Sequence, residues 1–137
     1  MKIHRRDFGL ILPFLAAARS SGQAKALPSE FFAYDELTVK TSGDNKSRAF
    51  FNGNTHTGFV VEMHETELPA GGAPHPSHHH DHEELIVIRE GTLEVMINGK
   101  TRKLGPGSVA YAASMEEHGV KNAGDTVARY WIIALGQ

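Results

Sequence analysis

The stretch PHPSHHHDHEEL, residues 74–85, places five histidines and three carboxylates within twelve positions. Imidazole nitrogens and carboxylate oxygens are ligands for divalent first-row metals. Two interpretations follow. The stretch is either a disordered histidine-rich tract that binds metal loosely, or the source of a few side chains that form one defined site. The spacing of the residues and the elements around them decide between the two.

The histidine stretch runs directly into Leu85-Ile86-Val87-Ile88, an apolar run that predicts a strand. If the extended conformation begins a few residues earlier, successive side chains alternate between two faces. His79 and Asp81 then point one way. The other face carries four potential metal ligands: His78, His80, His82 and Glu84. A loose tract needs no such phase, so the spacing favours a defined site.

Short β-branched or aromatic runs, separated by glycine and proline, make up the chain after Leu27. No segment keeps a 3.6-residue apolar period, which excludes a helical domain. Predicted strands lie at 48–51, 59–63, 85–88, 93–97, 108–112 and 127–134. The strand at 85–88 is apolar throughout, as expected of a strand covered on both faces, and Asn98-Gly99 predicts a hairpin turn. The pattern predicts an all-β sandwich or barrel.

Residues 1–26 have the composition of a secretory signal. A basic start with Arg5-Arg6 precedes an apolar run at 9–18, and Ala24-Lys25-Ala26 offers a cleavage site after Ala26. The apolar run is shorter than the roughly 20 residues that span a bilayer. The arginine pair resembles the twin-arginine signal, which predicts export to a bacterial periplasm. The alternative is an N-terminal amphipathic helix, which Pro13 disfavours.

The charge balance changes when this segment is set aside. It holds five of the 14 basic residues and one of the 16 acidic ones, so the remainder carries a net charge of −6. An acidic domain without a basic stripe is a poor partner for nucleic acid or an anionic membrane surface. The chain has no cysteine, which excludes thiol catalysis and thiolate ligands. The remainder is expected to form one domain, with an arm and first strands at 27–58 and a barrel at 59–137.

Two glycine-bounded patterns resemble the motifs of the cupin family. In the first, Gly72, His78, His80, Glu84 and Gly91 match every spacing. In the second, Gly107, His118 and Asn122 fit, but Ala113-Ser114-Met115 stands where the family has Pro-x-Gly. That departure leaves the turn before His118 open. The resemblance implies a double-stranded β-helix, also called a jelly-roll barrel.

The resemblance also implies a metal centre with one divalent transition metal per chain. Its ligands would be His78, His80, Glu84 and His118. Three imidazoles and one carboxylate leave positions open for water or substrate. Export after folding would let the cytoplasm fill the site first, which favours manganese or iron, with zinc, nickel and copper as alternatives.

Several other residues have open roles, and no catalytic residue is assigned. The candidates are His64, His82 and Tyr111. His82 could replace His80 as ligand, carry protons or lie at the rim. His64 could face the barrel interior as an acid–base group or be exposed on an edge strand. The remaining acidic and histidine side chains near the site are interpreted as solvated: His75, His79, Glu116 and Glu117.

The function predicted from these observations is that of an exported metal-dependent cupin, an enzyme of oxygenase, decarboxylase, isomerase or lyase type acting on a small oxygen-bearing substrate. The alternative is a non-catalytic module that binds metal or a small ligand. An acid–base group facing the metal would favour the enzyme. A homodimer is also expected, in which an arm within 27–41, carrying Phe31, Phe32 and Tyr34, packs across the partner.

Overall fold

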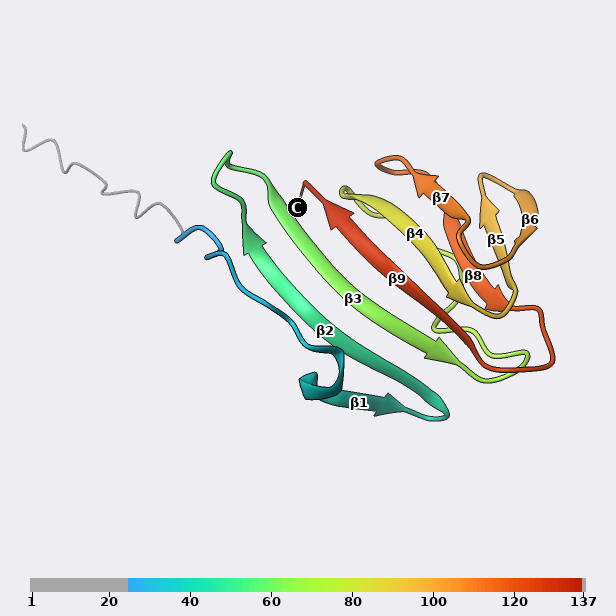
Figure 1. The fold of residues 1–137 in the computed structure, drawn as a ribbon. Coiled ribbons are helices and arrows are strands. Elements are labelled where there is room, and N and C mark those ends of the chain that lie inside the picture. The colour runs from blue at the N-terminus through green and yellow to red at the C-terminus, as the bar shows by residue number, and fades with distance from the viewer. Residues whose placement is uncertain (1–24, 137) are drawn as a thin grey trace, which may run out of the picture.

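The computed structural model describes residues 25–136 (Figure 1). The predicted signal sequence therefore lies almost wholly outside the described residues. Within that part of the chain, one 3-10 turn, η1 (Tyr34–Glu36), precedes nine strands: β1 (Val39–Ser42), β2 (Asn45–Asn54), β3 (Val60–Leu68), β4 (Glu83–Glu90), β5 (Leu93–Ile97), β6 (Lys100–Leu104), β7 (Val109–Ala112), β8 (His118–Asn122) and β9 (Ala128–Leu135). No helix among these residues has the length and apolar character needed to cross a membrane.

The strands form two antiparallel sheets that pack into a barrel. The larger sheet has the order β1-β2-β3-β9-β4-β7, and the smaller has the order β6-β5-β8. In Figure 1 the last strand, β9, lies between β3 and β4, so the chain returns to the middle of the larger sheet. This order is that of a double-stranded β-helix, or jelly-roll barrel, and it confirms the predicted all-β fold class.

The core lies between the two sheets and follows the two-residue period of the strands. Along β9 every second residue is buried, beginning with Ala128 and Tyr130. These side chains pack with Leu68, Ile86, Ile88, Leu93, Val95 and Ile132. The expectation that residues 85–88 are covered on both faces is wrong. Ile86 and Ile88 are buried, whereas Leu85 and Val87 are only half-buried, because they face outward from the larger sheet.

The predicted hairpin is present between β5 and β6. Both turn residues adopt a left-handed backbone, with φ of 48° at Asn98 and 76° at Gly99. A type I′ turn requires positive φ at both positions, and its twist matches that of the flanking strands. The Asn-Gly pair therefore fixes the register of the smaller sheet, in which Ile97 lies opposite Lys100 on β6 and opposite His118 on β8.

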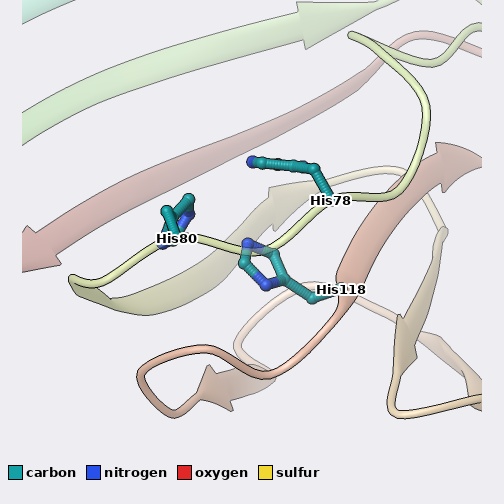
Figure 2. A group of neighbouring side chains, drawn as sticks. All are labelled: His78, His80 and His118. Carbon is teal, nitrogen blue, oxygen red and sulfur yellow. The ribbon is translucent and has the colours of Figure 1, made fainter.

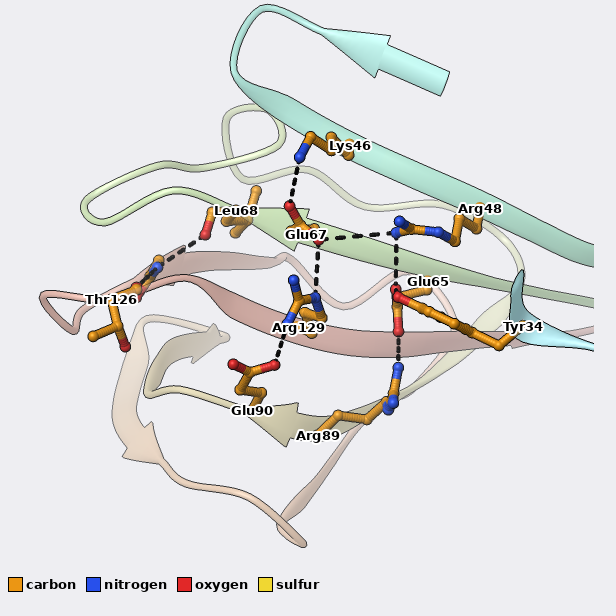
Figure 3. A network of polar contacts seen from close by, with 11 residues as sticks. Tyr34, Lys46, Arg48, Glu65, Glu67, Leu68, Arg89, Glu90, Thr126 and Arg129 are labelled. Carbon is orange, nitrogen blue, oxygen red and sulfur yellow. Dashed lines mark hydrogen bonds and ion pairs between the residues drawn. The ribbon is translucent and has the colours of Figure 1, made fainter. Parts of the chain in front are cut away.

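The outer face of the larger sheet carries a buried carboxylate, Glu65, which is fully inaccessible to solvent. The hydroxyl of Tyr34 donates to its Oε1 at 2.6 Å, Arg48 donates to the same oxygen at 3.2 Å, and Arg89 contacts Oε2 (Figure 3). Phe32 also packs against Phe51, with ring centroids 5.5 Å apart. The predicted arm thus lies on its own chain here, and the expected homodimer stays a prediction.

A second carboxylate on this face, Glu67, extends the network. Lys46 donates to its Oε1 at 3.1 Å and Arg129 to its Oε2 at 2.9 Å. Burial alone would raise the pKa of Glu67, but the hydrogen bonds from Lys46 and Arg129 outweigh it and hold the pKa below its usual value. Glu67 therefore stays ionised and joins β2, β3 and β9 on the side of the sheet away from the cavity.

The turn between β4 and β5 depends on Gly91. Its φ is +76°, and a Cβ atom there would lie 2.7 Å from the backbone oxygen of Val127 and 2.8 Å from the Cα of Ala128. Gly107 has a similar φ of +85°, but nothing lies within 4 Å of the corresponding point. The two glycines therefore separate the cost of the backbone conformation from the cost of a steric clash.

We predict that Gly91→Ala destabilises the fold more than Gly107→Ala. Both substitutions place an L-residue in a left-handed conformation, at about 1–2 kcal/mol. Only the first adds overpacking against rigid backbone, about 1–3 kcal/mol more. Urea unfolding midpoints of the two variants measure the difference. Equal midpoints would show that the turn at Gly91 has room to relax.

Candidate metal site

The histidine segment is joined to β8 by a two-residue bridge. The amide of His78 donates to the carbonyl of His118 at 3.0 Å, and the amide of His118 donates back to the carbonyl of His78 at 2.8 Å. Strand β4 begins only at Glu83, so the expected continuous extended run from 78 to 84 is not formed. The bridge, rather than a long strand, brings the two parts of the site together.

The turn before His118 forms although its sequence departs from the motif. Met115 occupies the position of the motif's glycine and adopts a left-handed backbone with φ of 62°. Its amide donates to the carbonyl of His80 at 2.8 Å, and the amide of Glu116 donates to the carbonyl of Ala113 at 3.2 Å. The same turn therefore also fixes the backbone of His80.

Three imidazoles meet at this bridge (Figure 2). His78, His80 and His118 each offer one ring nitrogen, and these three atoms lie within 4.8 Å of one another. Glu84 lies beside them, with Oε1 3.1 Å from His80 Nε2 and Oε2 3.3 Å from His118 Nε2. The four side chains that the cupin resemblance implies as ligands are thus clustered.

Backbone carbonyls orient two of the rings. His80 Nδ1 lies 2.9 Å from the carbonyl of His82, and His118 Nδ1 lies 2.8 Å from the carbonyl of Glu116. A carbonyl only accepts, so each Nδ1 carries the hydrogen and each Nε2 presents a lone pair. Metal-binding histidines are commonly held in this way, with the second ring nitrogen bonded to a carbonyl.

Two buried nitrogens in this cluster have no hydrogen-bond partner among the described residues: His78 Nδ1 and His118 Nε2. His118 Nε2 is within ion-pair distance of Glu84, but with its hydrogen on Nδ1 it cannot donate to that carboxylate. A buried polar atom left without a partner costs about 1–3 kcal/mol. A divalent cation would satisfy His118 Nε2 and the Glu84 carboxylate, so the donor set fits the metal that the motif implies.

The electrostatic setting keeps His78 in the form that binds metal. Burial lowers its pKa, and the neighbouring imidazoles of His75, His118 and His80 lower it further, while Glu84 acts in the opposite direction. A lower pKa means that the ring is neutral at neutral pH, and only a neutral imidazole has a lone pair for a cation.

The cluster opens into a cavity of about 150 Å³. Apolar walls come from Pro74, Ile86, Val120 and Ile132. The polar lining consists of His64, Thr66, His75, His78, Glu84, His118 and Tyr130. A concave, partly apolar space with a few convergent polar groups is typical of a small-molecule site.

The three catalytic candidates have different positions. His64 lines the cavity, and its Nδ1 lies 2.6 Å from Glu62 Oε1. His82 stacks on His80, with ring centroids 3.4 Å apart, and its Nε2 lies 3.4 Å from Glu84 Oε1. Tyr111 does not line this cavity: it is 49% exposed on β7, and a hydrogen bond with Glu83 raises its pKa.

Some of the other residues near the site lie where the sequence predicted, and others do not. His79 is exposed, as expected of a solvated loop residue. His75 is also exposed, yet it lines the cavity and its ring contacts His78 edge-on, with centroids 4.3 Å apart. Glu117 accepts a hydrogen bond from Ser77 at 2.7 Å. Sequence reasoning did not identify Tyr130, although the two-residue alternation of β9 was a signal from which its burial could have been predicted. Burial raises the pKa of Tyr130 and keeps its hydroxyl protonated.

Asn122, the last residue of the second motif, has a structural role. It is fully buried, and its side-chain amide donates to the carbonyls of Leu68, Pro69 and Thr126 at 3.1, 3.0 and 2.7 Å. Its Oδ1 accepts from the amide of Gly124 at 3.0 Å. These bonds fasten the end of β8 to the end of β3, four residues after His118.

Comparison with known proteins agrees with this fold. Residues 64–134 match the family model Cupin_2, a cupin domain. KdgF from Halomonas sp. superposes with a TM-score of 0.71 at 16% identity, covering 80% of this chain and 96% of that one. An RmlC-like cupin from Shewanella frigidimarina gives 0.68 at 16% identity, covering 84% and 95%. A predicted oxalate decarboxylase from Thermotoga maritima gives 0.59 at 20% identity, covering 79% and 100%. At these identities the likeness shows the fold alone.

A regulatory protein also shares a short segment with the chain. The HTH-type transcriptional activator RhaS of Mannheimia succiniciproducens is 34% identical over 50 residues. The match covers 36% of this chain and 19% of that protein, so the chain spans a minor part of the regulator's length.

We predict that alanine at His78, His80, Glu84 or His118 lowers bound metal at least about tenfold. Replacing a residue that only orients a ligand typically lowers metal affinity by about 10–100-fold, and each of these four substitutions removes a direct ligand. His79→Ala is the matched control, because this neighbouring histidine is exposed. Metal content after dialysis, with circular dichroism to check folding, measures the effect. Equal loss in His79→Ala, or full occupancy in His118→Ala, would contradict the assignment.

Proposed function

The chain belongs to the cupin family, and we propose that it is a metal-dependent enzyme that acts on a small oxygen-bearing molecule. One observation carries the proposal: three imidazoles and a carboxylate form a cluster in which two nitrogens are buried without partners, and the cavity beside this cluster also contains a separate histidine, His64. A module that only binds metal has no need of that further histidine.

In this proposal His78, His80, Glu84 and His118 hold a divalent transition metal. When bound, such a cation polarises a substrate oxygen as a Lewis acid. The remaining polar groups of the cavity then position the molecule. Tyr130 is a hydrogen-bond donor, since burial keeps it protonated, and Thr66 lies next to it in the lining. The apolar walls limit access of water.

The size of the cavity limits the substrate. A space of about 150 Å³ accommodates a molecule of a few heavy atoms rather than an oligomer. Ile86, Val120 and Ile132 provide an apolar surface for its carbon atoms, while its oxygen atoms face the ligand cluster. Small oxo acids and hydroxy acids fit this description.

We also propose export to the periplasm, as the Arg5-Arg6 pair and the apolar run after it indicate. The affinity of nitrogen and oxygen sites rises from manganese and iron to copper, largely regardless of function. A site that folds in the cytoplasm would be filled there, before the chain meets copper or zinc outside. Manganese or iron is therefore the metal that we favour.

The test is metal analysis of the protein exported by its own signal, followed by a screen of small oxygen-bearing acids and sugars with oxygen uptake and product both recorded. We expect manganese or iron, and turnover that His118→Ala abolishes. A chimaeric protein in which a signal for unfolded chains replaces residues 1–26 should contain more copper or zinc. Identical metal in the two proteins would refute the role of the export route, and metal-free protein from both would refute the metal centre.

For assembly we propose a homodimer formed by the outer face of the larger sheet. Half-buried Leu85 and Val87 lie opposite Tyr111 and Val109, which are 49% and 54% exposed. A contiguous apolar face of this kind usually marks an interaction surface, and a second barrel offers the same face in return.

We predict a dimer by light scattering at micromolar concentration, and a monomer for Val109→Lys, since the new charge would be buried at the contact without a partner. Val39→Lys is the matched control: Val39 is similarly exposed, at 44%, but lies on β1 at the opposite edge of the same sheet. A monomeric unsubstituted chain, or a dimer that survives Val109→Lys, would contradict this surface.

A further inference from the structure

Glu62 and His64 form a close pair on β3. They are two residues apart, so their side chains lie on the same face of the strand, the face that also carries the buried Leu68. His64 Nδ1 lies 2.6 Å from Glu62 Oε1. Both side chains are partly accessible, at 28% and 25%, so the pair is not sealed in the core.

The sheet register places this pair across from the metal ligands. Glu62 lies opposite Ala134 on β9, and Ala134 lies opposite Glu84 on β4. Two strand spacings, about 10 Å, therefore separate the Glu62 and Glu84 backbones, with only a methyl side chain between them. One row further along, His64 and Ile86 lie on either side of Ile132. His64 thus borders the same cavity as Glu84, His78 and His118, but from a different strand.

The hydrogen bond sets the chemical state of His64. An ionised carboxylate only accepts, so Nδ1 carries the hydrogen and Nε2 presents a lone pair. Nε2 has no hydrogen-bond partner among the residues that the structure describes. A carboxylate at Nδ1 also stabilises the imidazolium that forms when Nε2 takes up a proton. This is the arrangement of a general base with its orienting group.

We propose that Glu62 and His64 are a proton-transfer dyad for a molecule bound in the cavity at the site formed by His78, His80, Glu84 and His118. This inference rests on the proposed function and narrows it to isomerase-type chemistry. His64 Nε2 removes a proton from the carbon next to a substrate carbonyl, and the electron pair of the broken C–H bond stays in the substrate as an enolate. The imidazolium then returns the proton to a neighbouring atom. Charge and atoms balance without an oxidant or reductant.

If Glu62 and His64 were only a structural pair, replacing His64 would not change the number of protons released when a ligand binds in the cavity. If they are a proton-transfer dyad, that number changes. Acetohydroxamic acid is neutral in solution at about pH 8, where free imidazole is also neutral, and it binds divalent metals as its anion. Titration calorimetry of the zinc-loaded protein in two buffers of different ionisation enthalpy gives the protons released per hydroxamate bound. His64 should retain that proton in the unsubstituted protein, whereas His64→Gln should release about one more proton to the buffer.

Controls separate the outcomes. His79→Gln, at an exposed histidine that does not line the cavity, should match the unsubstituted protein. Zinc content should be unchanged in both variants. Equal proton release from the unsubstituted protein and His64→Gln would overturn the dyad while leaving the metal centre intact. Failure of the fully zinc-loaded protein to bind hydroxamate would instead refute the open metal positions on which the proposed function depends.

A second measurement tests Glu62 as the positioning residue. Nitrogen-15 NMR of the histidine rings should show His64 with its hydrogen on Nδ1, and Glu62→Ala should shift the population towards hydrogen on Nε2. Zinc affinity should not change, because Glu62 is two strands from Glu84. A ring that carries its hydrogen on Nε2 in the unsubstituted protein would contradict the dyad, since Nε2 could then not accept a proton.

Discussion

The bridge between His78 and His118 is the contact on which the site depends. Its two backbone hydrogen bonds join a loop of the larger sheet to the first residue of β8 in the smaller one. Without them, one imidazole would have no fixed relation to the rest. The bridge also explains why the site tolerates a segment that is not a regular strand: two amides and two carbonyls set the positions of His78 and His118, and the turn at Met115 does the same for His80. The histidine stretch is therefore a defined site in which only some members converge, and His79 is outside it.

The two faces of the larger sheet separate structure from chemistry. Glu65 and Glu67 face outward, each held by at least two cationic side chains, and they join the arm and four strands together. Removing one partner of such a buried pair leaves a charge uncompensated, which strongly destabilises a fold. Glu62, His64 and Thr66 alternate with them and face the interior. Ion pairs thus hold the outer layer together, whereas the inner layer carries polar groups that are only partly satisfied.

The sequence predicted the fold and the clustering of the candidate ligand side chains because both depend on local patterns. Turn residues and two-residue alternation define the strands, and the motif spacing places His78, His80 and Glu84 within one short segment. His118 followed from the second motif even though Met115 replaces a glycine there. The partners set by long-range register could not be predicted in this way. The positions of Tyr130 and Tyr111 depend on which face of β9 and β7 meets the interior, and the relation of Glu62 to Glu84 depends on β9 lying between β3 and β4. His75 lies in a loop that borders the cavity, and a loop has no periodic pattern from which the direction of a side chain could be predicted.

The placement of β9 has a consequence for the relation between the proposed metal site and the proposed base. His82, which neighbours the candidate ligands in sequence, stacks on His80 and lies beside the same carboxylate, Glu84, so it belongs to that cluster of side chains. His64 is on a strand that is remote in sequence and is separated from the ligands by a full strand. It therefore has its own carboxylate, Glu62, and a ring nitrogen free to exchange a proton. Insertion of β9 between β3 and β4 separates His64 from the candidate ligands but leaves both in one cavity. A substitution such as Ala134→Leu, on β9 between Glu62 and Glu84, would change that separation without replacing a residue of either group.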